Sequence, residues 1–211
     1  MIEVIPGILE QDFKVIEQKV GLVKSLVPWI HIDVLDNTLI KNVTYNQWEA
    51  YKPISSQVNL EVHLMVADPA KYIEPMVKNG FKRVLAHVEG DTVREFLHQA
   101  RSCEIEVGLA VDGPTAIASI EPFLSEVDGV LVMTITAGFS GQPFQPEQLF
   151  KIKHIHDGYP HLPIEVDGGI NKTIAALVME NGATRLVVTS YLFKQNPHRL
   201  KEAIEELKGM C

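Results

Sequence analysis

The sequence predicts a single α/β domain over residues 1–211, folded as a (β/α)8 TIM barrel. Short apolar segments rich in branched residues recur along the chain, and the stretches between them carry helix-capping residues. About eight such units occur, which favours a closed barrel over an open doubly wound sheet. The dinucleotide-binding GxGxxG pattern is missing after the first apolar segment, and this also disfavours the open sheet.

Eight apolar segments are expected to form the barrel strands. They lie at residues 4–9, 29–35, 58–66, 83–87, 106–111, 129–134, 162–166 and 186–189. Largely apolar runs of this length are typical of parallel strands that are buried on both faces.

Three helices are predicted from their end residues. Asp68-Pro69 is expected to open a helix that ends at Gly80, because Asp is a common N-cap and Pro suits the first turn. Asn171 is expected to cap a helix that ends at Gly182. Asn196-Pro197 is expected to open the last helix, whose apolar residues recur at helical spacing.

The composition limits the possible partners and location. A formal net charge of -8 disfavours binding to the phosphates of nucleic acids. The two cysteines, Cys103 and Cys211, provide no disulfide framework and suggest a reducing compartment. The first residues do not resemble a secretory signal, and no apolar run reaches the roughly 18 residues of a membrane-spanning helix. A cytoplasmic protein without nucleic-acid or membrane partners is therefore expected.

Ionisable side chains occur at three of the predicted strand ends. His31 and Asp33 are two residues apart, so they share one face of the second strand. His63 lies near the end of the third strand, and Asp167 follows the seventh. Active sites of barrels lie at the carboxyl ends of the strands. Two imidazoles and two carboxylates there could ligate one divalent ion such as Zn, Fe, Mn or Co, although each residue alone could be an ordinary hydrogen-bonded loop residue.

Small residues follow the sixth, seventh and eighth predicted strands. They are Gly138, Gly141, Gly168, Gly169, Thr189 and Ser190. Barrels often bind phosphate in such loops through backbone N–H groups, and glycine allows the anion to come close to the backbone. The sequence therefore predicts a phosphate site at these strand ends.

Seven segments together resemble the ribulose-phosphate 3-epimerase family. They are "PGILEQDF", "HIDVLDNTLIKNVT", "EVHLMV", "LAHVEG", "VMTITAGFSGQPF", "IEVDGGI" and "VVTSYLF". They occur in the order found in the family and extend from residue 6 to about residue 193.

The resemblance implies a barrel of the ribulose-phosphate-binding type and an isomerase of carbohydrate metabolism, in the pentose phosphate pathway. It implies one divalent metal ion held by His31, Asp33, His63 and Asp167, with Asp33 and Asp167 as the catalytic pair that epimerises a ketose phosphate. Substrate and phosphate contacts are implied at Gly7, Met65, Met133, Gly138, Phe139, Ser140, Gly141, Gly168, Gly169, Thr189 and Ser190. A homo-oligomer, either a dimer or a hexamer, is also implied.

Several positions depart from the family pattern. The family usually has Ser where this chain has Gly7, and Gly-Ser where it has Thr189-Ser190. In the second-strand loop, Leu35 replaces a pocket methionine and Lys41 replaces a proline. These changes concern residues that would shape the pocket, whereas the four predicted metal ligands are kept. His87 and Glu89, at the end of the fourth strand, are a candidate supporting pair.

Three functions fit these residues to different degrees. The leading hypothesis is 3-epimerisation of D-ribulose 5-phosphate to D-xylulose 5-phosphate. The same chemistry on another ketose phosphate, such as a hexulose 6-phosphate, and a non-catalytic sugar-phosphate-binding protein are the alternatives. The related barrel decarboxylases need an Asp-x-Lys-x-x-Asp motif, which the strand that begins Asp33-Val34-Leu35-Asp36 does not provide.

Overall fold

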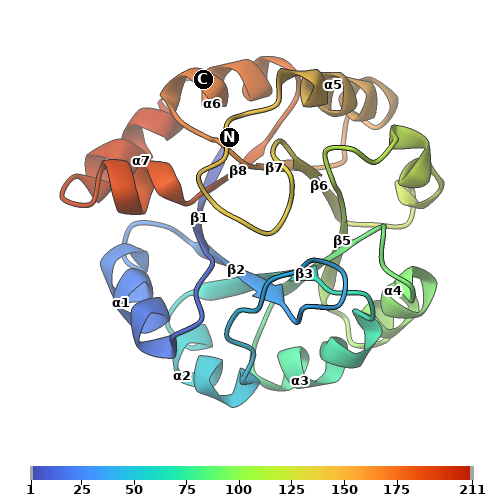
Figure 1. The fold of residues 1–211 in the computed structure, drawn as a ribbon, viewed down its shortest axis with the longest axis horizontal. Coiled ribbons are helices and arrows are strands. Elements are labelled where there is room, and N and C mark those ends of the chain that lie inside the picture. Colours follow the sequence, from blue (N-terminus) through green and yellow to red (C-terminus); the bar gives the residue numbers. More distant parts are fainter. Residues whose placement is uncertain (1, 210–211) are drawn as a thin grey trace.

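The computed structural model describes residues 2–209 and contains eight parallel strands that close into a barrel in sequence order (Figure 1). The strands are β1 (Glu3–Ile8), β2 (Trp29–Leu35), β3 (Asn59–Met65), β4 (Arg83–His87), β5 (Glu106–Val111), β6 (Gly129–Met133), β7 (Ile164–Asp167) and β8 (Arg185–Val188). β1 pairs with both β2 and β8, which closes the barrel. The predicted (β/α)8 architecture is confirmed.

Helices surround the barrel (Figure 1). The α-helices are α1 (Phe13–Val23), α2 (Lys52–Ser55), α3 (Ile73–Lys78), α4 (Val93–Ser102), α5 (Leu149–Gly158), α6 (Lys172–Glu180) and α7 (Leu200–Lys208). Short 3-10 helices are η1 (Trp48–Tyr51), η2 (Ala70–Tyr72), η3 (Ile117–Ser119), η4 (Glu121–Phe123) and η5 (Pro146–Gln148), and η6 (Tyr191–Gln195) is a π-helical turn. None of the helices among residues 2–209 has the length and apolarity needed to cross a membrane.

Two apolar clusters follow from the alternation of side chains along the strands. The larger cluster lies between the strands and the helices, and includes Ile30, Ile32 and Val34 of β2. The smaller cluster lies inside the barrel and includes Leu35 and Met65. The residues that alternate with the outer cluster therefore face the barrel axis, and on β2 these are His31, Asp33 and Leu35.

The capping predictions were partly correct. The side chain of Asn171 accepts a hydrogen bond from the Ile174 N–H, so it caps α6 as predicted. Gly80 and Gly182 follow α3 and α6 with positive φ angles of 86° and 110°, the left-handed conformation that glycine adopts easily.

Two predicted helix starts were wrong. Asp68 does not cap a helix, because its carboxylate accepts a hydrogen bond from the Thr92 hydroxyl instead. The turn after Pro69 is the 3-10 helix η2, and α3 begins only at Ile73; Pro75 has no N–H to continue an α-helical ladder from earlier residues.

The last helix also starts later than predicted. It begins at Leu200, and the Asn196 side chain donates to the carbonyl of Tyr191, which closes the turn η6 rather than opening α7.

Candidate active site

Four side chains predicted to bind a metal lie together inside the barrel. One potential ligand atom from each of His31, Asp33, His63 and Asp167 lies within 4.8 Å of the others. Nε2 of His31 and Nδ1 of His63 lie 3.2 Å and 3.0 Å from the same oxygen, Oδ1 of Asp33. Both imidazoles are fully buried, so their donor atoms are held against the carboxylates rather than in water.

The register of the strands brings these residues together. Asp33 of β2 is paired with His63 of β3, and Asp167 ends β7 next to Met133 of β6. In Figure 1, β2 and β7 lie on opposite sides of the barrel. The two aspartates therefore approach the same space from opposite walls.

The two aspartates differ in their preference for a proton. Burial works against the charged form of Asp33, but the charges and hydrogen bonds of His31 and His63 hold the pKa of its carboxyl well below the usual value. Burial and then the negative charge of Asp33 raise the pKa of Asp167 to about 8. One carboxylate and one carboxylic acid are thus favoured side by side at neutral pH.

The donor set fits a divalent cation. Two imidazole nitrogens and two carboxylate oxygens form a mixed set that suits a transition-metal ion such as zinc. The buried negative charge around Asp33 and Asp167 would also be compensated by such an ion.

A cavity of about 270 Å³ opens above this cluster, at the carboxyl ends of the strands. Asp33 and Asp167 are part of its wall. Of the residues predicted to contact substrate or phosphate, the cavity is lined by Met65, Met133, Gly138, Phe139, Ser140, Gly141, Gly168, Gly169, Thr189 and Ser190. Gly7 is the exception, because the position its side chain would take is filled by Thr189.

Glycine is required in the loop after β7. A Cβ atom on Gly168 would lie 2.6 Å from Cγ1 of Ile135, and one on Gly169 would lie 3.0 Å from the backbone nitrogen of Phe144. Both glycines also have positive φ angles. This loop therefore packs directly against the segment that follows β6, which projects over the barrel mouth in Figure 1.

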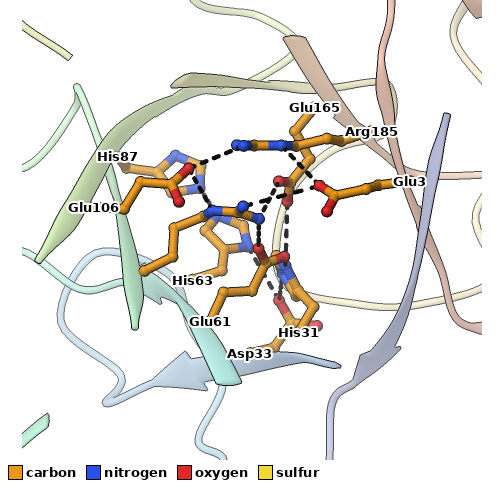
Figure 2. Close-up of polar contacts among 10 residues, drawn as sticks. Glu3, His31, Asp33, Glu61, His63, His87, Glu106, Glu165 and Arg185 are labelled. Atoms are coloured by element: carbon orange, nitrogen blue, oxygen red, sulfur yellow. Dashed lines mark hydrogen bonds and ion pairs between the residues drawn. The ribbon is translucent and has the colours of Figure 1, made fainter. Parts of the chain in front are cut away.

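A group of charged residues below the four ligands was not predicted from the sequence. Glu61, Arg83 and Glu165 are buried, and Arg83 forms an ion pair with Glu61. Oε1 of Glu61 lies 2.7 Å from Nδ1 of His31 (Figure 2). The signal was present in the spacing, since Glu61 and Glu165 each lie two residues before a predicted ligand and so share its face.

Comparison with known proteins identifies the family. A model of the ribulose-phosphate 3 epimerase family matches residues 3–193, which is most of the chain. The chain belongs to the ribulose-phosphate 3 epimerase family. The resemblance seen in the sequence is thereby confirmed.

Individual relatives agree with the family assignment. The ribulose-phosphate 3-epimerase of Bacillus subtilis (strain 168) is 35% identical over 218 residues, which cover 99% of each chain. The ribulose-phosphate 3-epimerase of Chlamydia muridarum (strain MoPn / Nigg) is 35% identical over 188 residues, which cover 85% of this chain and 82% of the relative. Membership of the ribulose-phosphate 3 epimerase family makes this chain an isomerase-class enzyme.

Solved structures share the fold at low sequence identity. A 3-hexulose-6-phosphate synthase gives a TM-score of 0.75 at 15% identity, with 99% of each chain covered. KGPDC from Streptococcus mutans, solved with a bound ribose 5-phosphate, gives a TM-score of 0.77 at 10% identity, with 100% of this chain and 97% of that chain covered. At such identities the similarity to this epimerase-family chain concerns the barrel alone.

Proposed function

We propose that this protein epimerises carbon 3 of a ketose phosphate and that its substrate is D-ribulose 5-phosphate, which becomes D-xylulose 5-phosphate. Asp33 and Asp167 form the proton-transfer pair. The observation that carries this proposal is the position of the two carboxyl groups, which reach one cavity from opposite walls with opposite preferences for a proton.

The reaction needs one base and one acid on opposite faces of carbon 3. The Asp33 carboxylate removes the proton from carbon 3, and the electron pair of the C–H bond moves toward the neighbouring carbonyl to give an enediolate. The Asp167 carboxylic acid then gives its proton to the other face of carbon 3. After one turnover the two aspartates have exchanged protonation states, which prepares the site for the reverse reaction.

His31, Asp33, His63 and Asp167 would hold a divalent ion, one of Zn, Fe, Mn or Co. Such an ion supplies Lewis-acid stabilisation of the negative charge that develops on the substrate oxygens. The role of the two histidines is to ligate through Nε2 of His31 and Nδ1 of His63, the nitrogens that face Asp33.

The phosphate group would bind in the loops after β6, β7 and β8. Oγ of Ser190 is buried and has no hydrogen-bond partner among the described residues, so it is free to donate to a phosphate oxygen. Nζ of Lys194 lies 3.5 Å from Oγ of Ser140 and adds a positive charge at the same edge of the cavity. The ribose 5-phosphate bound to KGPDC from Streptococcus mutans supports a sugar-phosphate site on a barrel of this shape.

Kinetics of two conservative variants test the proposal. In Asp33→Asn and Asp167→Asn, conversion of D-ribulose 5-phosphate should fall by about 100- to 10,000-fold in kcat, because each variant lacks one of the two proton carriers. Metal content is measured for each protein, so that loss of the ion is distinguished from loss of proton transfer. Asp157→Asn, on the exposed face of α5, is the matched control and should keep full activity.

The choice of substrate is tested in the same assay. A higher kcat/KM for a hexulose 6-phosphate than for D-ribulose 5-phosphate would replace the pentulose assignment. Full activity of either aspartate variant with bound metal would contradict the proposed pair.

A further inference from the structure

A line of three side chains leads from the barrel wall to His63. His87, the last residue of β4, is buried, and its Nε2 lies 2.8 Å from Nε2 of His63. Its Nδ1 lies 2.9 Å from Oε2 of Glu89. The two imidazole rings are within 17° of parallel, with centroids 4.9 Å apart, so they can share an in-plane hydrogen bond. Figure 2 shows His87 next to His63, on the far side of the latter from Asp33.

Glu89 provides a fixed end for this line. Its other oxygen, Oε1, accepts a hydrogen bond from the backbone N–H of Asp112, just after β5. Burial works against the charged form of Glu89, but its hydrogen bond with His87 and the charge of His87 hold its pKa at about 2. Glu89 is therefore an ionised carboxylate, which can only accept hydrogen bonds.

The hydrogen-bond directions then follow one from another for neutral imidazoles. Nδ1 of His87 must carry the hydrogen, because Glu89 can only accept. Nε2 of His87 is then the acceptor, so Nε2 of His63 must be the donor. Nδ1 of His63 is left with a lone pair, and this is the nitrogen that lies 3.0 Å from Oδ1 of Asp33.

We propose that His87 and Glu89 are positioning residues that fix His63 in the Nε2–H tautomer and so present Nδ1 of His63 to the divalent ion. This inference rests on the metal site of the proposed function. It assigns a role to two residues that contact neither the substrate cavity nor the predicted ion. His31 is held in a comparable way, since its Nδ1 contacts Glu61 and leaves Nε2 facing Asp33.

Nuclear magnetic resonance tests the tautomer directly. Long-range 1H–15N correlation spectra of the uniformly 15N-labelled, zinc-loaded protein should show hydrogen on Nε2 of His63 and on Nδ1 of His87. This measurement needs no variant and no substrate. A His63 ring that carries its hydrogen on Nδ1 would overturn the proposal.

Zinc affinity provides the second test. The dissociation constant is measured by competition with a chromophoric chelator. His87→Phe keeps a ring but cannot accept a hydrogen bond, so the constant should rise about 10- to 100-fold. His87→Gln can still accept from Nε2 of His63 through its amide oxygen and should stay close to the wild-type value.

A surface pair serves as the matched control. His154 and Glu121 make a contact of 2.6 Å on the exposed side of α5, so His154→Phe should leave zinc affinity unchanged. An unchanged dissociation constant in His87→Phe would contradict the proposal. If zinc binds with the expected tautomer but D-ribulose 5-phosphate is not epimerised, the positioning role stands and the substrate assignment fails.

Discussion

At the scale of single residues, Gly7 and Thr189 share one space on the neighbouring strands β1 and β8. A Cβ atom on Gly7 would lie 2.4 Å from Oγ1 of Thr189 and 2.8 Å from Cγ1 of Val187. A side chain at position 7 therefore conflicts with the threonine already present. The two departures from the family pattern are physically one coupled change.

This coupling predicts a non-additive pair of substitutions. Gly7→Ser alone should lower the free energy of unfolding by about 1–3 kcal/mol because of the overpacking. Thr189→Gly removes the conflicting side chain, so the double variant should recover a large part of this loss. Urea unfolding of the four proteins gives the coupling energy, expected at about 1 kcal/mol or more.

Gly21→Ser is a control for the substitution itself, because a Cβ atom there meets nothing within 4 Å. Strictly additive effects at positions 7 and 189 would show that the two side-chain positions do not compete.

The sequence predicted the four central residues because their signals are local. His31 and Asp33 share a strand face by their spacing, and the barrel fold places His63 and Asp167 at the same end. The structure brings all four within 4.8 Å, while their chemical roles stay predictions. The replacement of a Gly7 side chain by Thr189 could not be predicted, since it depends on the contact between the first and last strands.

At the scale of elements, the loop after β7 is fixed by the start of α6. Oδ1 of Asn171 accepts from the Ile174 N–H at 3.1 Å, and Asn171 also lines the cavity. Asp12 caps α1 in the same way, accepting from the Lys14 N–H at 2.9 Å, but it does not line the cavity. The two caps therefore allow stability and activity to be separated.

Asn171→Ala and Asp12→Ala should each lower the free energy of unfolding by about 1 kcal/mol, because a helix N–H loses its acceptor. Only Asn171→Ala should also lower kcat/KM, since it loosens the loop that carries Gly168 and Gly169. Thermal unfolding and the epimerase assay measure the two effects. Equal losses of kcat/KM in both variants would argue against a role for this cap in the cavity.

Element prediction succeeded where the pattern was regular. The apolar runs predicted all eight strands to within two residues at either end. The 3-10 turn η2 and the π-helical turn η6 were not predicted, because the competing hydrogen bonds of Asp68 and Asn196 are made to partners outside the expected helices.

At the scale of the whole molecule, a buried charge layer links strands across the amino-terminal side of the barrel (Figure 2). Arg83 of β4 forms ion pairs with Glu61 of β3 and Glu106 of β5. Arg185 of β8 contacts Glu106 at 2.9 Å and Glu3 of β1 at 3.0 Å. These contacts connect the first and last strands to the middle of the sheet, below the predicted metal site.

Arg83→Met should destabilise the protein strongly. Burial works against the charged form of Glu61, but His31 and Arg83 hold its pKa at about 2, so removal of the guanidinium leaves a buried carboxylate with less compensation. A loss of about 3–5 kcal/mol in the free energy of unfolding is expected from urea denaturation.

The exposed pair of Arg199 and Glu206 provides the control, and Arg199→Met should change stability by less than about 1 kcal/mol. A wild-type stability for Arg83→Met would mean that the buried charge layer does not hold the barrel together.

The central claim is that two aspartates on opposite walls move a proton on and off carbon 3 of a ketose phosphate. Its most direct test is to incubate the metal-loaded protein with D-ribulose 5-phosphate in heavy water and to follow carbon 3 by nuclear magnetic resonance. We expect deuterium to enter at carbon 3 while D-xylulose 5-phosphate appears. A protein with bound metal that yields neither deuterium at carbon 3 nor D-xylulose 5-phosphate would contradict the claim.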